Sequence, residues 1–219
     1  LLEAPVAAVD VAAAGNTAYW ATATGAFYSP GGNPPLSLGS RPESSAIAAA
    51  GEIALVGGRG TMQLCLVAEP TCDTPLQVEG GAFQAIAFDP STSSNNFKAY
   101  ALADNGVHEI PARATPGTFS INLFRPSLLS RPLRFGTATY ARGLAAGAKC
   151  VYFTGESGLE YATTGSRTEG GVLAASGAAL GVAVRTESAG KETVYFTVFA
   201  AEDAGGGVYS VAPPAVCAP

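Results

Sequence analysis

Short stretches of alternating apolar and polar residues, broken by turns that contain glycine, run through most of this chain. Residues 11–19 (VAAAGNTAY) and 47–55 (IAAAGEIAL) match position by position in residue class. Alternation with a period of two, rich in β-branched and aromatic residues, predicts strands, and the turn glycines supply the positive φ that tight hairpins need. Apart from short Ala-rich stretches that the repeat already explains as strands, no segment has a helical period of apolar residues. The pattern therefore predicts an all-β fold.

The same phrase recurs along the chain. Five copies of an apolar strand, a Gly-containing turn and a second alternating strand lie at residues 18–28, 54–64, 99–110, 151–161 and 194–211. A third strand is expected after the first four copies, at residues 36–38, 76–78, 121–123 and 172–173. The fifth copy lacks one, but Leu1-Leu2-Glu3 stands in the corresponding place before the first copy. Because such units cannot bury their own faces, we expect them to pack radially into a ring that the N-terminal strand closes.

These phrases, such as VYFT at 151–154 and GVYSV at 207–211, resemble those of β-propellers, and most of all the secreted bacterial repeat propellers with a Val-Tyr-Trp-Thr-like strand. The resemblance covers nearly the whole chain. It implies a single domain, residues 1–219, that forms a five-bladed β-propeller of four-stranded antiparallel blades. The expected blades are residues 6–38, 45–78, 84–123, 138–173 and 179–219, the last completed by residues 1–5. Such phrases encode packing, so the resemblance implies an architecture and carries over no functional residue.

Four cysteines bear on the compartment. Cys65 and Cys72 flank a short segment that contains proline, a suitable span for a disulfide across a strand-to-strand turn. Cys150 and Cys217 are then left to pair, and in the expected ring they lie on the same face of neighbouring blades. A zinc site would need close ligand pairs such as C-x-x-C, and the chain holds one histidine. The sequence therefore predicts two disulfides and a secreted, periplasmic or cell-surface location, with no metal and no other cofactor.

Composition and charge narrow the classes of partner. Hydrophobic residues make up 47% of the chain and charged residues 13%, so a core is easily filled. No apolar run approaches the roughly 18 residues that span a bilayer. We expect any targeting segment to have been removed or to lie outside this sequence. The net charge of −5 is the wrong sign for nucleic acid, so the arginines at 125, 131, 134 and 142 are interpreted as a solvated connection between blades.

Candidate catalytic residues are few. His108 is the only histidine and lies beside Glu109 on an expected strand, and no G-x-S-x-G motif is present. Asp10 and Asp89 belong to expected innermost strands, where two carboxylates roughly 5 to 10 Å apart across a funnel could hydrolyse a glycoside. The equivalent positions of the other repeats are Ala-rich, and no Trp or Arg accompanies the pair. We expect no enzyme activity, with a glycoside hydrolase as the least favoured alternative.

Binding is the remaining function. Aromatic residues near turns could stack on sugar rings or anchor a protein, although in blades they also serve as packing. The candidates are Trp20, Tyr28, Phe83, Tyr140, Tyr161, Phe199 and Tyr209. The longer turns, residues 91–96, 124–136 and 200–206, exceed what hairpins need and are the expected functional surface.

Three classes of function stay open at this point. The favoured one is a binding or scaffold module in an extracellular assembly, which predicts an exposed apolar patch and a protein partner. The next is a lectin-like propeller that binds glycans, which predicts an equivalent pocket in each blade. The divergence of the repeats argues against five equal sites. The hydrolase that uses Asp10 and Asp89 is third.

Overall fold

The computed structural model describes residues 7–39, 43–67, 71–73, 75–92, 96–114, 121–123, 127–130, 143–155, 158–164, 169–175, 179–187, 190–198 and 206–218. These residues form strands and one short 3-10 helix, Ala215–Cys217, as the all-β prediction requires. Among them no helix is long and apolar enough to cross a membrane. The Leu1-Leu2-Glu3 segment, which was expected to close the ring, lies outside the described residues.

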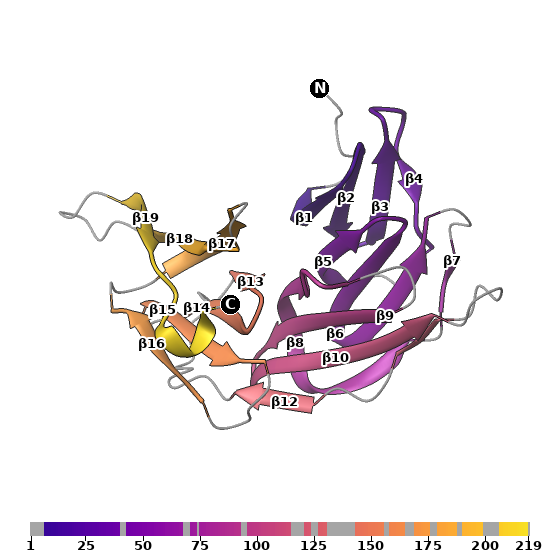
Figure 1. Ribbon diagram of the computed structural model, residues 1–219. Helices are drawn as coiled ribbons and strands as arrows, with labels where there is room; N and C mark the ends of the chain where they lie inside the picture. Colours follow the sequence, from indigo (N-terminus) through magenta and orange to yellow (C-terminus); the bar gives the residue numbers. More distant parts are fainter. Residues whose placement is uncertain are drawn as a thin grey trace.

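The strands form four sheets, drawn in Figure 1 as an arc around a common centre. The first sheet holds β1 (Ala8–Ala14), β2 (Thr17–Thr22), β3 (Gly25–Pro30) and β4 (Leu36–Ser37). The second holds β5 (Ser44–Ala50), β6 (Ile53–Leu66), β7 (Thr71–Cys72), β8 (Leu76–Phe88), β9 (Asn96–Ala103), β10 (Gly106–Ala114), β11 (Ile121–Leu123) and β12 (Ser127–Ser130). The third holds β13 (Leu144–Ala146), β14 (Cys150–Gly155), β15 (Gly158–Thr163) and β16 (Gly170–Ala174), and the fourth holds β17 (Ala179–Thr186), β18 (Glu192–Val198) and β19 (Gly207–Val211).

The prediction of five separate four-stranded blades is corrected by the second sheet, which has eight strands. The first half of β8 pairs with β6, through Leu76 opposite Met62 and Ala82 opposite Arg59. The second half pairs with β9, from Phe83 opposite Ala103 onward. The last strand of the second sequence repeat and the first strand of the third are thus one continuous strand, so five repeats give four sheets.

The repeats are named here by their strands. Repeat 1 is β1–β4, repeat 2 runs from β5 to the first half of β8, repeat 3 from the second half of β8 to β12, repeat 4 is β13–β16, and repeat 5 is β17–β19. Four clusters of buried apolar side chains join each repeat to the next. The core is therefore distributed between repeats, and each repeat is held by its neighbours.

Each inter-repeat core is made by two opposite faces. In repeat 2, Ile47 and Val56 lie opposite each other in register and pack onto repeat 1, whereas Ala48 and Leu55 pack onto repeat 3. The alternation of side chains along a strand produces this division. We call the face that packs onto the preceding repeat the backward face and the face that packs onto the following repeat the forward face.

Hydrogen bonds reinforce these contacts. Ser45 Oγ donates to Phe83 O at 2.7 Å, from repeat 2 to repeat 3. Thr154 Oγ1 donates to Leu180 O at 3.3 Å, from repeat 4 to repeat 5. Backbones also approach closely there, because a Cβ built on Gly143 would lie 2.8 Å from Val182 N. Only a glycine fits at position 143, which fixes the spacing of the last two repeats.

Candidate functional site

A cavity of about 380 Å³ lies at the centre of the arc, where the first strands of all five repeats meet. Its lining includes Val11 of β1, Ile47 of β5, Ile86 of β8, Leu144 of β13 and Val182 of β17. The volume falls in the range of small-molecule pockets. Of the described residues that line it, only Asp10 has a charged side chain.

Asp10 joins two repeats at this cavity. Its carboxylate accepts hydrogen bonds from the backbone N–H of Val11 at 2.9 Å and of Ile47, in the next repeat, at 2.8 Å. Burial raises the pKa of Asp10 above its ordinary value, and the two N–H donors oppose that shift. The Asp10 carboxylate thus accepts hydrogen bonds that link β1 of repeat 1 to β5 of repeat 2. The alanines at the equivalent positions, Ala46 and Ala85, have no side-chain acceptor for such a bond.

Asp89 does not join Asp10 at the cavity. It follows the end of β8, four residues beyond Ala85, the cavity-lining residue that corresponds to Asp10. Four strand residues span about 13 Å along the axis. Asp89 instead accepts hydrogen bonds from Ser91 and from the buried hydroxyl of Tyr100 at 2.8 Å, and this burial together with the carboxylate raises the pKa of Tyr100. The carboxylate pair of the hydrolase alternative is not assembled.

His108 is buried in β10, 5% exposed, and its Nε2 lies 2.6 Å from Asn105 Oδ1. Burial lowers its pKa below the ordinary 6.5. The residue does not line the central cavity. Its environment is that of a core histidine with one polar partner.

The predicted aromatic residues occupy three kinds of place. Tyr28 is buried in the core between repeats 1 and 2, stacked on Tyr19, and Tyr161 packs at the edge of the core between repeats 4 and 5. Phe83 is 1% exposed in the core between repeats 2 and 3. Tyr209 of β19 is 48% exposed and its ring contacts Phe196 at 5.7 Å between centroids. Tyr140 and Phe199 lie outside the described residues.

Trp20 lines a second cavity, of about 550 Å³, with Tyr19 and with Ala8, Val11, Ala12, Ala13 and Ala18. Its indole stacks on Phe27 at 6.1 Å between centroids. The indole Nε1 is buried and makes no hydrogen bond to any described part of the chain. A buried donor without an acceptor is costly, so this cavity suits an occupant that offers a hydrogen-bond acceptor. The sequence indicated Trp20 but not the cavity.

The two ends of the arc carry exposed apolar side chains. Val11 is 70% exposed, whereas its equivalents Ile47, Ile86 and Leu144 are 2%, 7% and 9% exposed and Val182 is half-buried. Val11 lies in register with Trp20 and Phe27 on the backward face of repeat 1, where Trp20 is 6% exposed and Phe27 half-buried, so Val11 is the exposed member of this row. Sequence reasoning missed this surface, because Val11 is of the same residue class as its buried counterparts.

At the other end, the forward face of repeat 5 consists of Ala183, Tyr195 and Ser210 in one row and of Thr197 and Val208 in the next. Their neighbour Phe196 points the opposite way, into the core with repeat 4. Val208 is 72% exposed. Tyr195 is only half-buried, whereas its equivalents Tyr19, Leu55, Tyr100 and Tyr152 are at most 1% exposed. The ring is therefore open between repeats 5 and 1 in the described residues.

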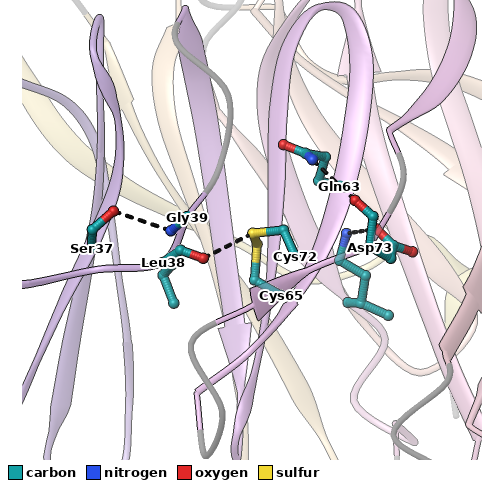
Figure 2. Close-up of a disulfide and its surroundings, with 8 residues drawn as sticks. Ser37, Leu38, Gly39, Gln63, Cys65, Cys72 and Asp73 are labelled. Atoms are coloured by element: carbon teal, nitrogen blue, oxygen red, sulfur yellow. Dashed lines mark hydrogen bonds between the residues drawn. A yellow bond between two sulfur atoms is a disulfide. The ribbon is translucent and has the colours of Figure 1, made fainter.

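Both predicted disulfides are confirmed. Cys65 bonds to Cys72, directly opposite it in the β6–β7 hairpin. Figure 2 shows this disulfide between Leu38, whose carbonyl oxygen lies 3.1 Å from the sulfur of Cys72, and Asp73, which accepts a hydrogen bond from Leu64 N at 2.9 Å. Cys150 bonds to Cys217 and ties the chain after β19 to the start of β14. The first disulfide fastens a hairpin, and the second fastens repeat 5 to repeat 4.

Comparison with known proteins bears on the fold. No protein-family model and no curated protein sequence matches the chain. Among solved structures, a hydrazine synthase of Kuenenia stuttgartiensis superimposes with a TM-score of 0.60 at 12% identity over 94% of this chain. The WD40 beta propeller domain of Doa1 superimposes with 0.55 at 13% identity over 94%, and the AfRom2 CNH domain with 0.52 at 10% over 90%.

The fold is that of a β-propeller. At these identities the likeness concerns the fold alone. The chain spans about two thirds of the length of these solved chains, namely 66%, 69% and 64%. The propeller prediction is thus confirmed at the level of architecture, with four sheets in place of five blades.

Proposed function

We propose that this chain is a non-catalytic binding or scaffold module that acts outside the cytoplasm and binds a protein through the two uncovered ends of its arc. The observation that carries the proposal is the 70% exposure of Val11, since Ile47, Ile86 and Leu144 at the same position of repeats 2 to 4 are buried and Val182 of repeat 5 is half-buried. Val9 and Val11 of β1 are 58% and 70% exposed, and exposed apolar side chains that lie together are typical of a protein interface. Two disulfides support an oxidising location, since they persist outside the reducing cytosol.

The test is a comparison of captured proteins. The chain is immobilised and exposed to an extract of the surface and secreted proteins of its source. Wild type is compared with Val11→Asp and with Val172→Asp, a matched control at an exposed valine of β16. We expect a protein retained by wild type and by Val172→Asp and lost from Val11→Asp. Retention by all three, or by none, would refute the proposal.

Glycan binding is the second candidate, and Trp20 favours it. An indole in a 550 Å³ cavity with an unpartnered N–H offers a stacking surface and one donor, as sugar sites do. The equivalents of Trp20 are Val56, Ala101, Phe153 and Phe196, so the chain would carry one such site. Binding to a glycan array that Trp20→Leu abolishes would support this candidate, and an unchanged binding pattern would oppose it.

A further inference from the structure

We propose that the central cavity binds an aliphatic ammonium ion, with the Asp10 carboxylate as its counter-charge. The inference goes beyond the proposed function, because it concerns the centre of the arc and not its ends. The cavity lies between the first strands of the five repeats and has a volume of about 380 Å³. Four of these strands, β1, β5, β13 and β17, are terminal in their sheets, so each presents an edge to the centre.

The carboxylate of Asp10 distinguishes repeat 1 from the other repeats at this level of the cavity. The residues at the equivalent position, all of which line the cavity, are Ala46, Ala85, Gly143 and Gly181. Ile86 and Leu144 are nevertheless buried against the preceding repeats, as Ile47 is. Packing one repeat onto the next therefore does not require a carboxylate, and the charge in the cavity is not explained by the fold.

The charge of Asp10 has no partner of opposite sign. No described lysine, arginine or histidine lines the cavity, and none forms an ion pair with Asp10. Burial raises the pKa of Asp10, because its negative charge is less well solvated there than in water. A cation in the cavity would compensate for this loss of solvation.

Hydrogen bonding in the cavity favours a ligand that donates. Four residues of the lining already use their backbone N–H groups within the protein, two toward Asp10 and two toward threonine hydroxyl oxygens of β14 and β18. They are Val11, Ile47, Gly143 and Gly181. Each oxygen of the Asp10 carboxylate can accept a further hydrogen bond. An ammonium group, with three N–H donors and a positive charge, matches these acceptors.

The rest of the lining favours an alkyl chain on the ammonium group. It consists of apolar side chains and glycines, with Val11, Leu144 and Val182 among them. The volume of about 380 Å³ exceeds that of a bare ammonium ion and lies at the lower end of the range for small-molecule pockets. The ligand class is therefore a primary ammonium on a short alkyl chain, which is either a free amine or the lysine side chain of a protein.

The experiment is a nuclear magnetic resonance titration of the full chain with n-butylammonium chloride. The backbone amides of Val11 and Ile47 donate to Asp10, so their signals should shift. We expect a dissociation constant on the order of 1 mM for so small a ligand. The amide of Ala82 donates to Asp104, which does not line the cavity, and its signal should not shift. n-Butanol has the chain without the charge and should bind at least about tenfold more weakly.

Two variants separate the charge of Asp10 from its hydrogen bonds. Asp10→Asn keeps a side-chain oxygen that can accept an N–H, and it should bind n-butylammonium at least about tenfold more weakly than wild type. Asp104→Asn is the matched control, because Asp104 also accepts a backbone N–H from another repeat, and it should bind as wild type does. Circular dichroism of both variants checks that they are folded.

The titration of wild type decides the inference without any variant. It is overturned if Val11 and Ile47 do not shift up to about 20 mM n-butylammonium, roughly twenty times the expected dissociation constant. Equal binding of n-butanol, or equal binding by folded Asp10→Asn, also overturns it.

The peptide acetyl-Gly-Lys-Gly-amide distinguishes the two sources of the ammonium group. Binding of both the peptide and n-butylammonium assigns the site to a lysine of a protein, and binding of n-butylammonium alone assigns it to a free amine. Capture of a protein through Val11 is measured separately, so this inference and the proposed function can fail independently.

Discussion

Removal of the Cys150–Cys217 disulfide should cost about twice as much stability as removal of Cys65–Cys72. The two bonds close loops with sequence separations of 67 and 7 residues. The loss of loop-closure entropy from the unfolded chain then corresponds to about 4.4 kcal/mol for the long loop and about 2.4 kcal/mol for the short one at 25 °C. We predict the difference of about 2 kcal/mol between the two variants, because the part of the entropy loss that is independent of loop length is the same for both and cancels.

The assay is urea unfolding of wild type, Cys150→Ala/Cys217→Ala and Cys65→Ala/Cys72→Ala. Fluorescence of Trp20, the only tryptophan, reports on repeat 1, and circular dichroism reports on the whole chain. If fluorescence and circular dichroism change over the same range of urea concentration, unfolding is two-state and the unfolding free energies of the variants can be compared. The reasoning is refuted if the short-loop variant loses as much stability as the long-loop variant, since a loop ten times longer would then add no constraint.

Three further predictions concern the cores. Tyr100→Phe should lower the unfolding free energy by about 1.5–3 kcal/mol, because the buried Asp89 carboxylate loses a hydrogen-bond donor. Tyr152→Phe should be neutral or stabilising, because the buried hydroxyl of Tyr152 bonds to no described residue. Equal losses for the two variants in urea unfolding would contradict this prediction. Gly143→Ala should lower the unfolding free energy by about 1–3 kcal/mol, because the new Cβ would clash with Val182 N. Gly171→Ala should lower it much less, because its Cβ would lie 3.5 Å from the nearest atom. Equal destabilisation of the two variants in thermal unfolding would contradict this prediction. Nuclear magnetic resonance of the single imidazole should give His108 a pKa below 6.5. The stability that the neutral, buried His108 contributes is present above pH 6.5 and is lost as the pH falls through that lowered pKa. A measured pKa above 6.5 would contradict the burial of His108.

Local features of this fold could be predicted from the sequence because they repeat. The phrases at 11–19 and 47–55 form the same hairpin, and Gly15 and Gly51 share one left-handed conformation. The Cys65–Cys72 disulfide followed from its short span across a turn. The count of sheets could not be predicted, because Gly80-Gly81 is typical of a turn between two strands, whereas one strand, Leu76–Phe88, runs through this point with Gly81 at a φ of 85°.

The candidate site was harder to predict, because it depends on what is missing beside a repeat. Val11 and Ile47 are interchangeable in the sequence pattern, and only the arrangement of repeats leaves one exposed and the other buried. Asp10 was correctly placed on an innermost strand, but its partner is Ile47 N rather than Asp89. An acceptor role toward a backbone N–H leaves no trace in the sequence beyond the carboxylate itself.

Covalent footprinting of the dilute chain tests the central claim most directly, because it compares the exposure of two equivalent side chains in one molecule. A carbene or hydroxyl-radical probe should modify Val11 strongly and Ile47 hardly at all, in keeping with their exposed fractions of 70% and 2%. Equal protection of both residues at a concentration where the chain is monomeric would show that the face of repeat 1 is already covered, and would contradict the account.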